Sequence, residues 1–97
     1  MIYLIAYSIN EKLYDYSELK EQIKSLGRFQ HPMDDVWFVS SEHLDEEYEA
    51  EKLRRYLHSE RDMIFMTRIT KPSVQGWMPK VFWQWLESQD KWLKKYK

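Results

Sequence analysis

Ile2-Tyr3-Leu4-Ile5-Ala6-Tyr7-Ser8-Ile9 is the stretch that decides the fold. It is almost continuously apolar and rich in β-branched and aromatic residues, which is typical of a β-strand. Because both alternating sets of its side chains are apolar, we expect a central strand that is covered on both faces, or one that faces a partner. Asn10-Glu11-Lys12 ends this strand.

A helix is predicted after the first strand. Asp15 stands three residues before Glu18, the spacing of a capping box at a helix start. The predicted buried face repeats at steps of three and four and consists of Tyr16, Leu19, Ile23 and Leu26. Gly27 is expected to end the helix, because glycine adopts a left-handed conformation at little cost.

Two further strands and a second helix follow. Residues 28–33 and 36–39 are expected to pair as a hairpin around a turn at 32–35. Acidic residues 45–47 begin the second helix and basic residues follow in its later turns, as the helix dipole favours. A fourth strand is predicted from Met63 to about Thr70.

This order is strand, helix, strand, strand, helix, strand. It predicts an α+β fold of the ferredoxin-like βαββαβ type, with a four-stranded antiparallel sheet and two helices on one face. The 97 residues are enough for one domain, so we expect a single domain over 1–97. Within it, residues 1–70 form the βαββαβ core and residues 71–97 form a C-terminal loop and helix.

The C-terminal segment is rich in tryptophan. Pro79 suits the first turn of a third helix, whose apolar stripe consists of Phe82, Leu86 and Leu93. Aromatic side chains also lie off this stripe, which indicates a surface that packs against more than its own sheet. We therefore expect a dimer contact formed by Trp77, Trp83, Trp85 and Trp92. Stacking of nucleic-acid bases on these indoles is the alternative, and packing is favoured.

Composition limits the classes of function. Fifteen Lys and Arg residues against sixteen Asp and Glu residues give a net charge of −1, which argues against nonspecific nucleic-acid binding. The absence of cysteine excludes disulfides and thiolate metal sites. No apolar run is long enough to span a membrane, and the first residues lack the features of a signal peptide, so a cytoplasmic protein is expected.

Basic residues of the second helix and the turn after it form a candidate surface for nucleic acid or a protein partner. They are Lys52, Arg54, Arg55 and Arg61. The favoured interpretation is a solvated helix face on which pairs such as Glu51 and Arg55 neutralise each other. The three histidines have no zinc-ligand spacing, and two glycines cannot form a glycine-rich phosphate loop. No metal or other cofactor is expected.

Three segments resemble a family of small bacterial and phage proteins that are described as SinR-like and are related in fold to VapD-type toxins and to the nuclease-fold subunit of the CRISPR spacer-acquisition complex. These segments are 2–9, 15–27 and 35–40, and the ending 76–86 resembles the Trp-rich ending of such proteins. The resemblance implies a ferredoxin-like fold, a homodimer, and a setting in phage or bacterial defence or in a toxin–antitoxin pair. In the nuclease-fold relatives it also implies an aspartate at the end of the first strand of each subunit, where the pair binds a divalent metal.

Ser8 occupies that position here. A neutral hydroxyl is a far poorer ligand for Mg²⁺ than a carboxylate, so we expect no metal site and no catalytic residue at this strand end. The hypothesis is a noncatalytic dimeric binding protein rather than an enzyme. The alternative is a metal-dependent endoribonuclease whose acidic site has moved to Asp15, Asp34, Asp35 or Asp62. A structural or regulatory subunit of a larger complex is a third interpretation.

Overall fold

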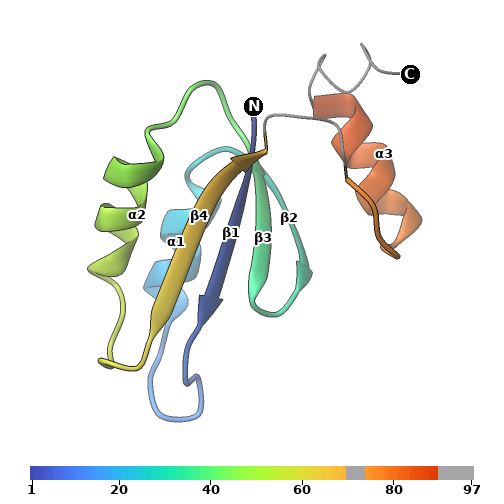
Figure 1. Cartoon of the computed structure of the whole chain (residues 1–97). Helices are drawn as coiled ribbons and strands as arrows, with labels where there is room; N and C mark the ends of the chain where they lie inside the picture. Colours follow the sequence, from blue (N-terminus) through green and yellow to red (C-terminus); the bar gives the residue numbers. More distant parts are fainter. Residues whose placement is uncertain (70–73, 90–97) are drawn as a thin grey trace.

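The computed structural model of this chain describes residues 1–69 and 74–89. Seven elements follow one another in these residues (Figure 1). The strands are β1 (Ile2–Ser8), β2 (Arg28–Met33), β3 (Val36–Ser40) and β4 (Met63–Ile69). The helices are α1 (Ser17–Lys24), α2 (Glu46–Arg54) and α3 (Lys80–Gln89).

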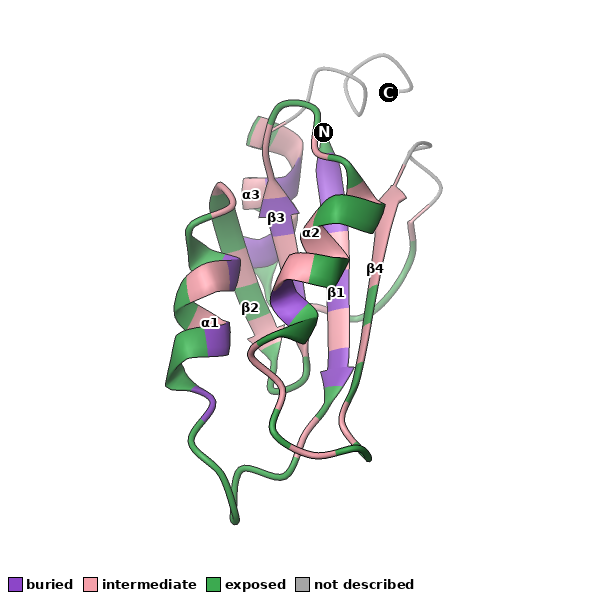
Figure 2. Cartoon of the chain, turned by 90° about the vertical axis from the view of Figure 1, so that its left-hand side faces the viewer, coloured by how far each residue is buried: buried purple, intermediate pink, exposed green. Residues whose placement is uncertain are grey.

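The four strands form one antiparallel sheet in the order β2-β3-β1-β4. β1 is central, since it pairs with β3 on one side and with β4 along its whole length on the other. Helices α1 and α2 cover one face of the sheet, and α3 lies on the opposite face (Figures 1 and 2). The predicted α+β class, with a four-stranded antiparallel sheet and two helices on one face, is therefore confirmed.

The main core lies between the sheet and the helices α1 and α2. Successive side chains of a strand point to opposite faces, so Ile5 and Tyr7 of β1 point toward these helices together with Trp37 of β3. Leu19 and Ile23 of α1, with Leu53 of α2, are fully or almost fully buried against them. The predicted apolar face of α1 thus serves this core, and α2 contributes Leu53 to it.

A second, smaller core lies between the other sheet face and α3. Ile2, Phe82 and Leu86 are its buried members. Phe38 of β3 meets Phe82 edge to face, with ring centroids 4.8 Å apart. Both faces of β1 are therefore apolar because each covers a core over part of its length.

The start of α1 differs from the predicted capping box. Tyr16 occupies the N-cap position, and its side chain makes no capping hydrogen bond. The Asp15 carboxylate accepts a hydrogen bond from the Ser17 amide at 2.9 Å, so it serves the first turn from one residue further out. The Tyr16 ring is buried in the main core, so this side chain is not available to cap the helix.

Gly27 is not required for the predicted reason, a left-handed conformation at the end of the helix. No described glycine has a positive φ, so Gly27 does not end α1 in a left-handed conformation. A Cβ added there would lie 2.2 Å from the carbonyl oxygen of Ser40. Glycine is needed because the chain passes close to the end of β3 as it enters β2.

The predicted start of α2 is confirmed. Asp45 is the N-cap, and its carboxylate accepts a hydrogen bond from the Tyr48 amide at 3.2 Å. The predicted third helix is present as α3, but it begins at Lys80, so Pro79 lies directly before the helix rather than in its first turn. The predictions for Thr70, Trp92 and Leu93 lie outside the described residues.

Candidate functional site

The sheet face that carries α3 is only partly covered by it. Beyond α3, this face exposes apolar side chains of all four strands, a patch that we call the open face. It consists of Leu4, Ala6, Met33, Val36, Met63 and Phe65. Met63 is 64% exposed, Phe65 63% and Met33 48%. Charge is almost absent here, since Arg28 at the far end of β2 is the one charged strand residue on this side of the sheet.

A groove runs between this face and the segment that leads into α3. Its volume is about 360 Å³. The sheet contributes Leu4, Met33, Phe38 and Ile69, and the other wall includes Val74, Met78 and Trp83. Gln75 is its one polar lining residue. The groove and the open face share Leu4 and Met33, so they form one continuous apolar surface.

The described tryptophans of the predicted dimer contact lie in two different environments. Trp83 and Trp85 are half-buried and pack against the second core of their own chain. Trp77 is fully exposed, just before α3 begins. Trp92 lies outside the described residues. Among the described tryptophans, Trp77 is therefore the one whose whole surface is available to a partner.

The predicted basic surface is partly neutralised within α2. Lys52 lies 3.4 Å from the Glu49 carboxylate, and Arg54 pairs with Glu51. The expected pair of Glu51 with Arg55 is not formed, because the i,i+3 partner Arg54 takes both oxygens of that carboxylate. The hydrogen bond from Arg54 lowers the pKa of Glu51 and raises that of Arg54.

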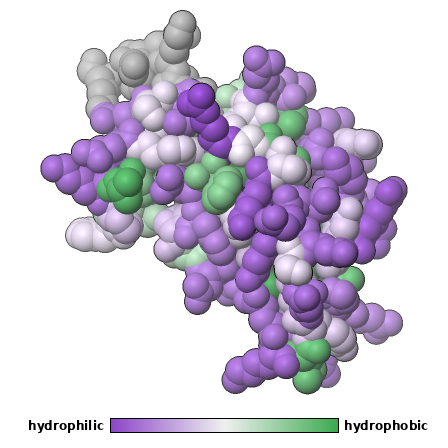
Figure 3. Space-filling model, turned by 180° about the vertical axis from the view of Figure 1, so that it is seen from behind, coloured by the Kyte–Doolittle hydropathy of each residue, from purple (hydrophilic) through white to green (hydrophobic). Residues whose placement is uncertain are grey.

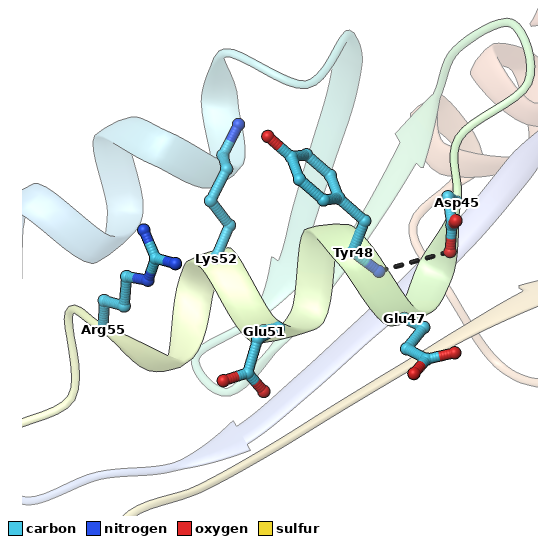
Figure 4. Close-up of a pocket in the computed structure, with 6 residues that line it drawn as sticks. All are labelled: Asp45, Glu47, Tyr48, Glu51, Lys52 and Arg55. Carbon is cyan, nitrogen blue, oxygen red and sulfur yellow. Dashed lines mark hydrogen bonds between the residues drawn. The ribbon is translucent and has the colours of Figure 1, made fainter.

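A shallow cavity of about 360 Å³ follows the outer side of α2. Figure 4 shows Tyr48, Lys52 and Arg55 on one side of the helix, with Glu47 and Glu51 turned the other way. The Lys52 ammonium lies 5.7 Å from the centre of the Tyr48 ring. Arg61 lies in the turn before β4 and is not among the lining residues, so the four predicted basic residues do not form one site.

The side of the molecule seen from behind is mostly hydrophilic (Figure 3). It shows hydrophobic residues only in separate small patches. Such scattered residues are normal for a folded protein, whereas a contiguous apolar patch indicates an interaction site. The open face with its groove is therefore the strongest candidate for a binding surface.

Ser8 lies exposed at the end of β1, on the open-face side of the sheet and opposite Met63. The turn between β2 and β3 reaches the same end, where the Tyr7 amide donates a hydrogen bond to the Asp35 carbonyl at 3.0 Å. The Tyr7 hydroxyl donates to the Asp34 carbonyl and accepts from the Trp37 indole at 2.9 Å. Burial raises the pKa of Tyr7, against the effect of the Trp37 hydrogen bond. Tyr7, the neighbour of Ser8 in the sequence, is therefore part of the main core together with Trp37.

Asp62 connects two loops that the sequence did not link. One of its oxygens accepts hydrogen bonds from the Tyr16 hydroxyl at 2.6 Å and from the amides of His58 and Ser59. Burial acts to raise the pKa of Asp62, but these hydrogen bonds outweigh it and lower the value. Tyr14 stacks on the His58 ring at 5.4 Å and completes the contact. No signal in the sequence joins Tyr16 to a residue 46 positions away.

Two of the three histidines, His31 and His58, have packing contacts that the sequence does not predict. His31 stacks on Trp37 with ring centroids 3.7 Å apart, and His58 lies between Tyr14 and Tyr16. Over residues 1–69 and 74–89, the histidine, aspartate and glutamate side chains form no group of three that could hold a metal ion.

Arg68 also finds its partner inside the chain. The sequence leaves open whether this charge on β4 faces solvent or pairs with a carboxylate across a subunit seam. Its Nε lies 3.4 Å from the Glu46 carboxylate of α2, and neither atom makes a hydrogen bond among the described residues. The contact is therefore an ion pair between β4 and α2.

None of the described helices has the length and apolar character needed to cross a membrane. Comparison of the chain with protein-family models, with curated proteins and with solved structures found no match.

Proposed function

We propose that this chain is a noncatalytic, ferredoxin-like protein that acts as a homodimer by binding a protein partner. The ferredoxin-like assignment is supported by the order of elements along the chain and by the strand order β2-β3-β1-β4, with α1 and α2 on one face. A defence or toxin–antitoxin setting is part of the proposal and has the resemblance as its support.

The observation that carries the proposal is the open face. Exposed Met33, Met63 and Phe65 lie beside the central strand on a sheet face that is almost free of charge. Sheets of this kind normally bury an apolar face against another layer. A phosphate backbone requires cationic groups, so this face is suited to a protein rather than to nucleic acid.

Light scattering on the pure chain tests the homodimer. We expect a mass of twice 12.1 kDa at micromolar concentration. A mass of 12.1 kDa at the highest attainable concentration would contradict the homodimer.

The noncatalytic assignment depends on Ser8. A divalent metal that activates water needs anionic oxygen ligands, and the serine hydroxyl is neutral. In the presence of Mg²⁺, we therefore expect no EDTA-sensitive cleavage of either single-stranded or structured RNA.

One observation favours a metal-dependent endoribonuclease as the second candidate. The turn that holds Asp34 and Asp35 lies at the same end of the sheet as Ser8, through the bond from the Tyr7 amide to the Asp35 carbonyl. Both aspartates are exposed, so their carboxylates are accessible to a metal ion. Asp62, in contrast, already accepts three hydrogen bonds within the chain.

The same RNA assay separates the two candidates. EDTA-sensitive cleavage that survives Ser8→Ala and is lost in Asp35→Asn would establish the relocated acidic site and overturn the noncatalytic assignment. Glu60→Gln, which removes an exposed acid from a different loop, is the matched control and should cleave as the wild type does.

A further inference from the structure

Trp77 and the apolar groove are two unexplained features of the same part of the molecule. Trp77 is 100% exposed. Gln75 and Met78, on either side of it in the sequence, line the groove. The indole therefore stands at the rim of an apolar groove that it does not occupy.

We propose that Trp77 of one subunit enters the groove of a second copy of this chain, and that the exchange is reciprocal. An exposed knob and an empty groove on one surface are the two halves of a self-complementary contact. A two-fold axis then places each indole in the groove of the other subunit at once. This inference rests on the proposed homodimer and names the contact that forms it.

The chemistry of the two surfaces matches. The groove is lined by uncharged residues, and Gln75 among them provides a polar group for an indole N–H. Because these lining residues are uncharged, the pairing of two copies brings no like charges together in the groove. An isologous interface between charged patches would instead bring like charges together.

The extent of the apolar surface also favours contact with a second copy over the insertion of a single side chain. Burial of one tryptophan removes about 150–250 Å² from water, whereas a stable interface needs roughly 800 Å² from each partner. The open face continues from the groove through Leu4 and Met33, and Phe65 and Met63 are mostly exposed there. A subunit held at the groove covers these residues as well, which brings the contact toward the required size.

Sedimentation equilibrium of single-site variants tests the contact. Trp77→Ala should weaken dimerisation roughly tenfold or more, as loss of a buried aromatic side chain at the centre of an interface does. Tyr48→Ala is the matched control, because Tyr48 is 61% exposed but lies on α2, which covers the opposite sheet face. Its dissociation constant should stay within about twofold of the wild-type value, since the residue lies outside the contact.

Cysteine cross-linking gives the position of the contact directly, since the chain contains no cysteine. Gly76→Cys keeps the neighbouring indole, and a Cβ at residue 76 meets nothing within 4 Å. When this variant is mixed with Met33→Cys and oxidised, a disulfide-linked dimer of the two different variants should form. A mixture of Tyr48→Cys with Met33→Cys should give none.

The outcomes separate the inference from the function on which it rests. A monomeric wild type would contradict both the proposed homodimer and this contact. A dimeric wild type that is unchanged by Trp77→Ala, or that gives no mixed disulfide, would overturn the groove contact and leave the homodimer standing. A dimer lost in Phe65→Lys but not in Trp77→Ala would place the interface on the open face alone and would equally contradict the inference.

Discussion

At the scale of the residue, close approach of two backbone segments explains Gly27. The missing Cβ leaves room for the Ser40 carbonyl, at a distance of 2.2 Å from the position that the Cβ would take. We expect Gly27→Ala to lower the free energy of unfolding by about 1–3 kcal/mol, because the end of β3 must move. Chemical denaturation measures the change.

The second glycine provides the control for this prediction. A Cβ at Gly76 meets nothing within 4 Å, and its φ is not positive. Gly76→Ala should therefore leave the stability unchanged or raise it by up to about 1 kcal/mol, through the lower entropy of the unfolded chain. Equal losses at both positions would show that the contact with Ser40 is not what requires glycine.

Asp62 makes a second prediction at this scale, one that depends on pH. Its three hydrogen bonds lower its pKa below the ordinary 3.8, so the folded state is favoured above that pH and this contribution is lost as the pH falls through the lowered value. Asp62→Asn should cost about 1 kcal/mol at pH 7, a figure reduced for exposure to solvent. The difference from wild type should shrink below about pH 4.

Urea denaturation at a series of pH values measures this difference. Glu60→Gln removes a charge two residues away and serves as the control, with an expected change within about 0.5 kcal/mol. A gap between wild type and Asp62→Asn that stays constant down to pH 2 would show that the ionised carboxylate is not what connects the two loops.

At the scale of the element, α2 depends on its N-cap. Asp45 satisfies the Tyr48 amide, which has no partner within the helix. Asp45→Ala should lower the stability by about 1 kcal/mol, whereas Asp45→Asn should keep most of it, because an asparagine side chain caps almost as well. Thermal unfolding followed by circular dichroism distinguishes the two variants. Equal loss in both would assign the effect to the charge rather than to the cap.

At the scale of the whole molecule, β1 is the element on which both cores depend. It is hydrogen-bonded on both edges, contributes Ile5 and Tyr7 to the main core and contributes Ile2 to the second. We expect its amides to exchange with deuterium only through global unfolding, whereas amides of residues 74–79 should exchange much faster. Hydrogen exchange followed by NMR tests this order. Slower exchange in β4 than in β1 would contradict it.

The sequence by itself determined the class of the fold. The apolar run of β1, the spacing of Leu19 and Ile23, and the acidic start of α2 are local patterns. Burial acts on each of them through the period of its own element. They were therefore enough to predict the sheet and two covering helices. The tryptophans were predicted together as one contact, and only the structure separates the exposed Trp77 from the half-buried Trp83 and Trp85.

Only the tertiary structure decided which apolar residues remain uncovered. The sequence shows that both faces of β1 are apolar, but not that α3 leaves Phe65 and Met63 exposed or leaves a groove beside Trp77. It also does not show that Asp62 meets Tyr16 or that Gly27 meets Ser40. These contacts join residues far apart in the chain, and their distances depend on how the layers pack rather than on any local pattern.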